Sequence, residues 1–295
     1  MQNRLPLTSD YVFKRIFGQE ENKEALKDFL ESILDVEIKN IEINNPEIPK
    51  NYYDSKFALL DLRVTLNTEV VVDVEMQMQN QHNMQQRSPF YMASNYANSI
   101  KEGQPYTECK KSIGINILNF NYYKRNSYHS IARMKFEEPK PDEVVDMGYK
   151  EQDEYATKYL EMHIIELPKF KKKNPEMHTK IAQWLWLFVG SEEQMEKAGK
   201  LNKEIRKINK KLASMSLSNE ERNNYEFRLK AIRDEADAIE HATRQGIEQG
   251  IEQGQEQEKK ETVKRMLRKN VKVEDIVEFT GLNEEEVEEI RKEIN

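Results

Sequence analysis

Residues 59–77 alternate between apolar and polar side chains, and this period of two restricts the fold more than any other feature of the 295-residue chain. Successive side chains of a strand point to opposite faces, so LLDLRVTL and VVVDVEMQ each predict a strand with one apolar face and one face that carries acids. The three residues NTE between them predict a tight antiparallel turn. Counting back from this turn, Asp61 lies opposite Glu75 and both carboxylates share a face.

Asp61 and Glu75 predict a metal site, because each interrupts a run that is otherwise as apolar as a buried strand. A carboxylate in such a place costs free energy unless it is paired or binds a metal. Two carboxylates on one face suit Mg²⁺ or Mn²⁺, which take oxygen ligands, and the main-chain carbonyl of Met76 is a candidate third ligand. A solvated strand face with outward acids has the same pattern, and the spacing alone leaves both interpretations open.

Helical and strand-like patterns alternate over the first 190 residues, which predicts an α/β layer architecture. The expected elements are helices within 8–18 and 22–34, a helix beyond Pro89 within 87–101, and strands at 112–120 and 162–167.

Beyond about residue 190 apolar residues recur three and four apart, which predicts an all-α C-terminal region. The expected divisions are an α/β domain over 1–190, an antiparallel helical hairpin or coiled coil over 191–245, a Gly-x-x-x-Gly repeat or linker over 246–257, and a helix-turn-helix-like tail over 258–295. The repeat GIEQ-GIEQ-GQEQ fits a helix or a flexible linker, since each glycine costs about 0.5–1 kcal/mol against alanine in a helix. The apolar seam and the glycine repeat together predict a homo-oligomer.

The tail is acidic, with three Lys or Arg and nine Asp or Glu in residues 270–295, a net charge of −6. A phosphate backbone repels such a surface. We therefore expect assembly rather than DNA reading from this segment, in which Val273, Ile276, Val277 and Phe279 supply the apolar positions of the second helix.

The bulk composition excludes several other classes of protein. The single cysteine, Cys109, rules out an internal disulfide framework and suits a reducing compartment. The N-terminus lacks the apolar stretch of a signal peptide, and no apolar run is long enough to span a membrane. We expect a cytoplasmic protein. Its net charge of −7 gives no global attraction to nucleic acid, so DNA binding would need a local basic groove.

An ordered set of segments resembles the recombination-promoting nuclease / putative transposase family of the PD-(D/E)XK nuclease superfamily. The segments are DYVFKRIFG, ENKEALKDFLESIL, SKFALLDLRV, VDVEMQMQNQ, RSPFYMASNYANSI, SIGINILNF, HIIELPKF and GIEQGIEQG. This resemblance implies a restriction-endonuclease-like mixed central sheet flanked by helices. It also implies Mg²⁺-dependent DNA cleavage in a bacterial setting linked to recombination, with Asp61, Glu75 and Gln77 as the catalytic set.

Gln77 departs from the superfamily pattern, because it stands where a lysine is usual. Lysine can position and polarise the attacking water with a positive charge, whereas an amide is not a base near neutral pH. We expect Gln77 to orient the water and the metal to make it nucleophilic, which predicts a slower and strongly metal-dependent enzyme.

Other residues are candidates for supporting roles. Lys56, Arg63, Arg87 and Tyr91 are candidates for contacts with substrate, and surface or salt-bridge roles remain open for them. Asp73 shares a face with Glu75 and is either a second acid of the site or an exposed strand residue. An acid from the first two helices could complete the metal site, and the candidates are Asp10, Glu24 and Glu31. The five histidines show no metal-ligand spacing.

Two alternatives to a DNA endonuclease remain. The chain could keep the nuclease fold without useful catalysis and act as a binding module for DNA or protein. It could also be a transposase that joins strands as well as cutting them, although no motif specifically supports strand transfer.

Overall fold

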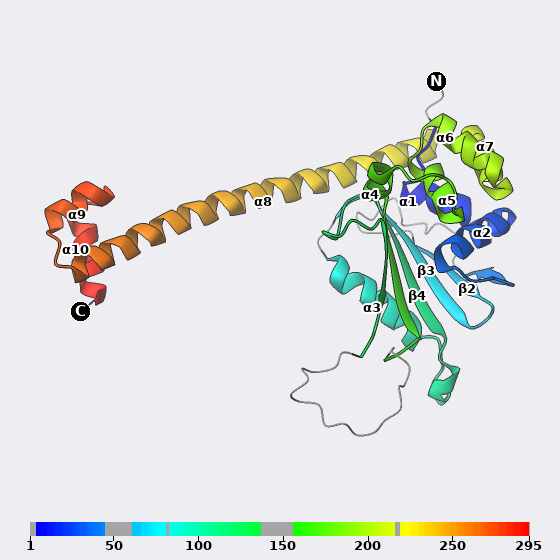
Figure 1. Cartoon of the computed structure of the whole chain (residues 1–295), viewed down its shortest axis with the longest axis horizontal. Coiled ribbons are helices and arrows are strands. Elements are labelled where there is room, and N and C mark those ends of the chain that lie inside the picture. Colours follow the sequence, from blue (N-terminus) through cyan, green and yellow to red (C-terminus); the bar gives the residue numbers. More distant parts are fainter. Residues whose placement is uncertain (1–3, 45–60, 81–82, 137–155, 216–218, 295) are drawn as a thin grey trace. The chain divides into compact units, whose positions relative to one another are not determined.

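A computed structural model describes residues 4–44, 61–80, 83–136, 156–215 and 219–294 (Figure 1). The chain divides into two compact units, Met1–Arg228 and Leu229–Asn295. The divisions expected at residues 190, 245 and 257 stay a prediction.

The first unit is built on a mixed sheet, as the family resemblance implies. Within the described residues the sheet has six strands in the order β1-β2-β3-β4-β6-β5. The central strands β3, β4 and β6 are parallel, and β1, β2 and β5 add to them antiparallel. The strands are β1 Ile41–Ile43, β2 Asp61–Leu66, β3 Val70–Gln77, β4 Lys111–Leu118, β5 His129–Arg133 and β6 Leu160–Glu166.

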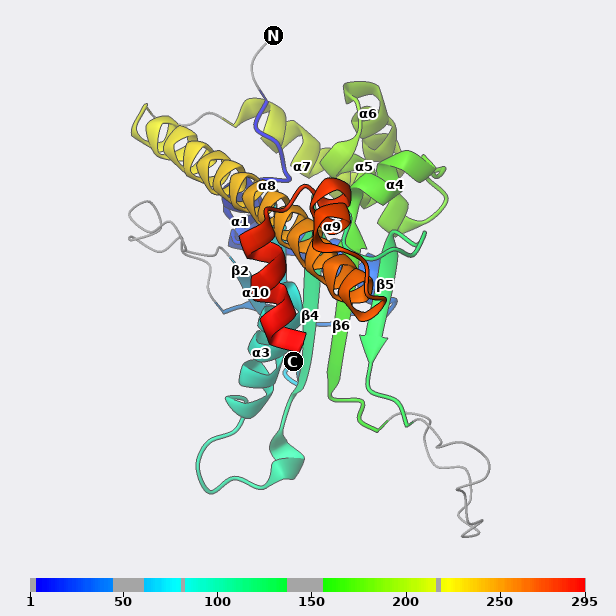
Figure 2. The ribbon, with the colours of Figure 1, turned by 90° about the vertical axis from the view of Figure 1, so that its left-hand side faces the viewer.

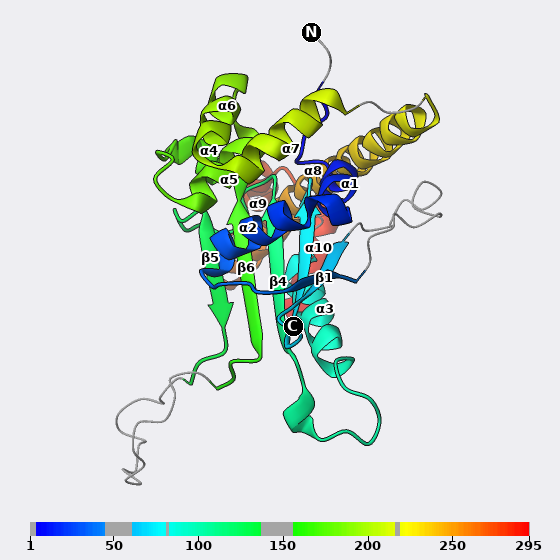
Figure 3. The same cartoon turned by 90° about the vertical axis from the view of Figure 1, so that its right-hand side faces the viewer.

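Helices cover both faces of this sheet. The helix α3, Met84–Ala97, packs on β3, β4 and β6, whereas α1, Asp10–Phe17, contacts β2 and β3. Figure 1 shows α3 and α2, Lys23–Leu34, on opposite sides of the strands, and Figure 3 shows α2 lying across them. Figure 2 shows α4, Leu167–Lys173, and α5, Lys180–Val189, at one end of the strands. The remaining helical segments of this unit are η1 Glu20–Asn22, η2 Tyr106–Glu108, α6 Glu192–Leu201 and α7 Lys203–Ser214.

The expected strand pattern is confirmed. Leu62, Val64 and Leu66 of β2 are buried, while the residues between them are partly exposed. The apolar faces of β2 and β3 meet the helices on the side of α1 and α2, where aromatic rings supply much of the core. Phe29 lies at the centre of this core, with the rings of Phe17 and Trp184 at centroid distances of 5.5 and 5.4 Å.

The turn between β2 and β3 fixes the register. Asn67 and Thr68 have φ values of 49° and 66°, and the N–H of Glu69 donates to the carbonyl of Leu66. This left-handed pair matches the twist of a tight hairpin, and asparagine is one of the few residues that tolerate it readily. The Asn67 side chain also accepts hydrogen bonds from the N–H groups of Lys39 and Asn40. With Leu66 opposite Val70, Asp61 lies opposite Glu75, as the sequence predicts.

Two expectations for the helices need correction. The helix that follows β3 begins at Met84, so Pro89 lies inside it rather than before it. The apolar seam beyond residue 190 is divided between α6 and α7, which meet at Asn202. Ile205, Ile208 and Leu212 of α7 are buried, and α7 packs on α2, α5 and α6.

The glycine repeat lies within a helix. The helix α8, Asn219–Arg268, is continuous through GIEQ-GIEQ-GQEQ. At Gly246, Gly250 and Gly254 a Cβ atom would meet nothing within 4 Å. Of the two structures that the repeat allows, the helix is the one observed.

The second unit has its own small core. The helices α9, Val273–Thr280, and α10, Glu284–Ile294, enclose it with the end of α8. Gly281 ends α9 in the left-handed region, at φ 70°. Phe279 takes no part in this core, because 79% of its surface is exposed. The buried members are Val263, Ile276, Val287 and Ile290.

Candidate active site

The acids predicted to bind metal lie side by side on β2 and β3. Asp61 is the first residue of β2 and pairs across the strands with Glu75 of β3. Glu75 is 8% exposed, and the Asp61 side chain is 31% exposed. Both side chains leave the sheet on the face opposite to the apolar residues of β2, which is the face covered by α3. The structure therefore brings the two predicted ligands together at the edge of a buried region.

Asp73 adds a third carboxyl group to this face. It pairs across the strands with Arg63, and its carboxyl group is hydrogen-bonded to that of Asp61. Burial, together with the neighbouring negative charge of Asp61, raises the pKa of Asp73 to about 8. At neutral pH the Asp73 carboxyl group therefore carries a proton. Of the alternatives for Asp73, the structure shows the acid beside Asp61 rather than an isolated exposed strand residue.

Glu75 is held by two neighbours. A guanidinium nitrogen of Arg87 lies 2.7 Å from Oε1 of Glu75, and the Gln77 amide donates to Oε2 at 3.1 Å. Burial raises the pKa of Glu75, whereas the charge of Arg87 and the hydrogen bond from Gln77 oppose that rise. The amide of Gln77 therefore orients a carboxylate in this structure.

The helix α1 contributes two further charged groups. Asp10 and Lys14 are four residues apart and so share one face of the helix, and both are buried. The charge of Asp10 acts on Glu75 and raises its pKa. The ammonium of Lys14 donates to the main-chain oxygen of Asp61 at 2.9 Å, and burial lowers its pKa while the carboxylates of Asp61 and Asp73 oppose that change.

Of the three acids considered from the first two helices, Asp10 is the one whose charge raises the pKa of Glu75. Glu24 is exposed, and Glu31 accepts a hydrogen bond from the N–H of Ile38. Sequence reasoning missed Lys14 altogether. A signal was present, because Lys14 lies one helical turn after Asp10 in a helix that also carries the apolar residues Val12, Phe13, Ile16 and Phe17.

The candidates for substrate contacts are placed unequally. Arg63 lies 3.6 Å from an oxygen of Asp61 and remains 41% exposed at its side chain. Arg87 forms an ion pair with Glu75. Tyr91 lies one turn later on α3 and is 37% exposed. Lys56 lies outside the described residues.

The face beneath α3 continues in polar residues that the sequence did not single out. Asn116 of β4 pairs with Glu75 in the sheet, and its side-chain oxygen accepts a hydrogen bond from the hydroxyl of Ser88 at 2.9 Å. The hydroxyl of Ser112 donates to the carbonyl of Met92. These bonds fasten α3 to the sheet and hold Arg87 in place beside Glu75.

The donor set suits a small divalent cation. Burial raises the pKa values of Asp73 and Glu75, and neighbouring carboxylates add to the rise, as expected where acids lie close together away from water. One oxygen of Asp73 is buried without a hydrogen-bond partner among the described residues. In the described part of the chain no group of three or more His, Cys, Asp or Glu side chains forms a ready cage for a metal ion. A cation here would therefore be held by Asp61 and Glu75, with main-chain oxygen or water completing its shell.

A second cluster of charged groups lies on β5 and β6. His163 is buried between Glu161, at 2.8 Å, and His129, at 3.0 Å, and Arg133 and Lys111 also contact Glu161. Side chains alternate along β6, so Glu161 and His163 point away from the face covered by α3. This cluster is separate from the acids of β2 and β3.

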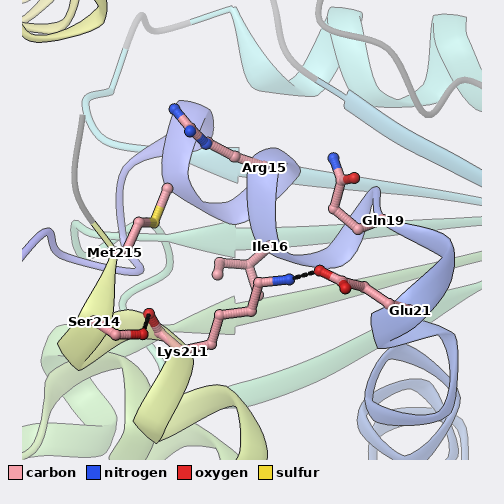
Figure 4. A pocket seen from close by; sticks show the side chains of 7 residues that line it. All are labelled: Arg15, Ile16, Gln19, Glu21, Lys211, Ser214 and Met215. Atoms are coloured by element: carbon pink, nitrogen blue, oxygen red, sulfur yellow. Dashed lines mark hydrogen bonds and ion pairs between the residues drawn. The ribbon is translucent and has the colours of Figure 1, made fainter. Parts of the chain in front are cut away.

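A hollow of about 430 Å³ lies between α1 and α7. Figure 4 shows the Lys211 ammonium directed at the carboxylate of Glu21, with Arg15 on the neighbouring turn of α1. None of the residues predicted for the active site lines it.

The fold and the site define the class of protein. A mixed sheet flanked by helices, with paired acids on adjacent antiparallel strands, is the arrangement of a PD-(D/E)XK nuclease domain. A family model described as "PD-(D/E)XK nuclease family transposase" matches residues 7–242, and the chain belongs to this family. No curated protein and no solved structure matches the chain. No helix among the described residues is long and apolar enough to cross a membrane.

Proposed function

We propose that the protein is a metal-dependent DNA endonuclease that hydrolyses phosphodiester bonds in recombination or mobile-element biology. The observation that carries this proposal is the cross-strand pair Asp61 and Glu75, joined by Asp73 on the same face. Membership in a nuclease family supports DNA as the substrate.

The side chains divide the work in the following way. Asp61 and Glu75 would hold Mg²⁺ or Mn²⁺, which would lower the pKa of a bound water molecule and neutralise charge on the phosphate. Gln77 and Arg87 fix the orientation of Glu75 through its two oxygens. Arg63, which is partly exposed beside Asp61, contacts the DNA backbone, and Tyr91 borders the same face.

Asp73 regulates the charge of the site. The proton on Asp73 reduces the electrostatic repulsion between its carboxyl group and that of Asp61. The neutral form of Asp73 thus allows these acids to lie together on one face of the sheet.

The pair between Glu75 and Arg87 supports a second candidate, a nuclease-fold protein that binds DNA or protein without useful catalysis. Arg87 already neutralises Glu75 at 2.7 Å, and position 77 carries no charge. This candidate predicts DNA binding without cleavage.

Cleavage of a labelled duplex oligonucleotide by the full-length protein, with Mg²⁺, Mn²⁺ or EDTA, separates these functions. The endonuclease proposal predicts metal-dependent products that disappear with Glu75→Ala. Binding without products supports the non-catalytic module, and joined products support a transposase with strand transfer. Sedimentation of the full-length chain tests the expected homo-oligomer.

A further inference from the structure

Lys14 is unusual because it is a cation in the interior. Its exposed fraction is 2%, and no other lysine or arginine among the described residues is as fully buried. Removing an ammonium from water costs several kcal/mol after relaxation. A methionine or leucine would fill the same space without this cost, so packing alone does not account for a lysine at this position.

The surroundings of Lys14 connect it with the acids of the site. Its Nζ donates to the main-chain oxygen of Asp61 at 2.9 Å, and the carboxylates of Asp61 and Asp73 are its principal charged neighbours. Among the described residues this carbonyl is the one hydrogen-bond acceptor of the ammonium. Lys14 thus holds the first residue of β2 by its backbone and faces the side chains that would bind metal.

The other cations of the site do not have this arrangement. The guanidinium of Arg87 forms an ion pair with Glu75, and the side chain of Arg63 is 41% exposed. Gln77 has no charge, and its amide nitrogen donates to Glu75. Among the cations that the structure describes, Lys14 is therefore the one that is both buried and directed at Asp61.

We propose that Lys14 is a positioning residue that supplies, from α1, the fixed positive charge that a lysine at position 77 would supply. It acts through Asp61, whose backbone it anchors and whose carboxylate it attracts. This inference rests on the proposed nuclease function. In the superfamily pattern a lysine at position 77 would lie on β3 with Glu75. The proposal places this positive charge on α1 instead.

The test compares full-length wild type with Lys14→Met, Lys14→Arg, Gln77→Lys and the double variant Lys14→Met/Gln77→Lys. Lys23→Met is the matched control, because Lys23 lies on α2 and pairs with the exposed Glu20. Two quantities are measured for each protein. They are the affinity for Mn²⁺ by calorimetry and the rate of metal-dependent DNA cleavage.

We expect Lys14→Met to bind Mn²⁺ about tenfold more tightly, because a positive charge next to the metal ligands is lost. The same variant should cleave DNA more than about tenfold more slowly, as is typical when a partner of a metal ligand is removed. Lys14→Arg should keep much of the activity. Gln77→Lys should restore part of the cleavage in the Lys14→Met background and weaken Mn²⁺ binding again.

Three results would overturn the role of Lys14. They are cleavage by Lys14→Met within about threefold of wild type, a loss of cleavage with unchanged or weaker Mn²⁺ binding, and no recovery in the double variant. The second of these would identify Lys14 as a structural anchor only. Absence of cleavage by the wild type is a different outcome, because it refutes the nuclease function itself.

Discussion

Replacing Asp73 by asparagine should change how the stability of the first unit depends on pH. The pKa of Asp73 is raised to about 8 in the folded protein, and an unfolded aspartate has a pKa of about 3.9. Between these values the folded chain holds one proton that the unfolded chain has lost. The free energy of unfolding therefore falls as pH rises through this window, by about 1.4 kcal/mol per pH unit.

The asparagine variant lacks this titration but keeps an N–H donor for Asp61. From pH 5 to pH 7 the variant should thus gain about 3 kcal/mol relative to wild type, and the gain should level off above pH 8. Urea unfolding in EDTA measures this difference. Both tryptophans of the chain, Trp184 and Trp186, lie in the first unit, so their fluorescence reports this unit alone. Glu69→Gln, in the exposed turn after β2, controls for the loss of one carboxylate. If the free energies of unfolding of Asp73→Asn and wild type changed in parallel with pH, the raised pKa of Asp73 would be refuted.

Three further variants test other parts of the structure. Arg87→Met leaves Glu75 buried without its ion pair and should lower the free energy of unfolding by about 3 kcal/mol, measured in urea; an unchanged midpoint would show that the pair is not formed. Phe29→Ala opens a cavity at the centre of the core and should cost about 3–5 kcal/mol, and a loss below 1 kcal/mol would contradict its placement. His163, Arg133 and Lys111 lower the pKa of Glu161. The stabilisation from Glu161 is complete above pH 5 and is lost progressively as pH falls from the unfolded value of about 4.3 toward the much lower folded value, so the advantage of wild type over Glu161→Gln should begin to shrink at pH 3–4. An advantage that stays constant down to pH 3 would contradict this coupling.

Local patterns were sufficient to predict the hairpin of β2 and β3. Period-two alternation gave the faces of both strands, and a three-residue turn gave the register between Asp61 and Glu75. The left-handed conformations of Asn67 and Thr68 fix the turn and hence the register. A slip of one residue is also unfavourable, because it would turn every apolar side chain to the polar face. Family resemblance then supplied the expectation of a mixed central sheet flanked by helices, whereas the order of its strands comes from the structure.

Tertiary placement was harder to predict. Lys14 and Asp10 reach the site because α1 packs against β2 and β3, and a helical stripe in the sequence does not reveal which element it will face. The pairing of Arg87 with Glu75 depends likewise on how α3 lies on the sheet. For the glycine repeat of α8, intrinsic propensity favours neither helix nor linker decisively, and only the structure shows the helix.

The most direct test of the central claim is nicking of supercoiled plasmid by the full-length protein with Mn²⁺, compared between wild type and Asp61→Asn. The account predicts nicking by wild type that EDTA abolishes. It predicts that Asp61→Asn nicks more than about 100-fold more slowly, since losing only a partner of a metal ligand costs 10- to 100-fold, while Trp fluorescence shows an intact fold. Equal nicking by the two proteins, or no nicking by wild type at any Mn²⁺ concentration, would contradict the assignment of Asp61 and Glu75 as a metal-dependent nuclease site.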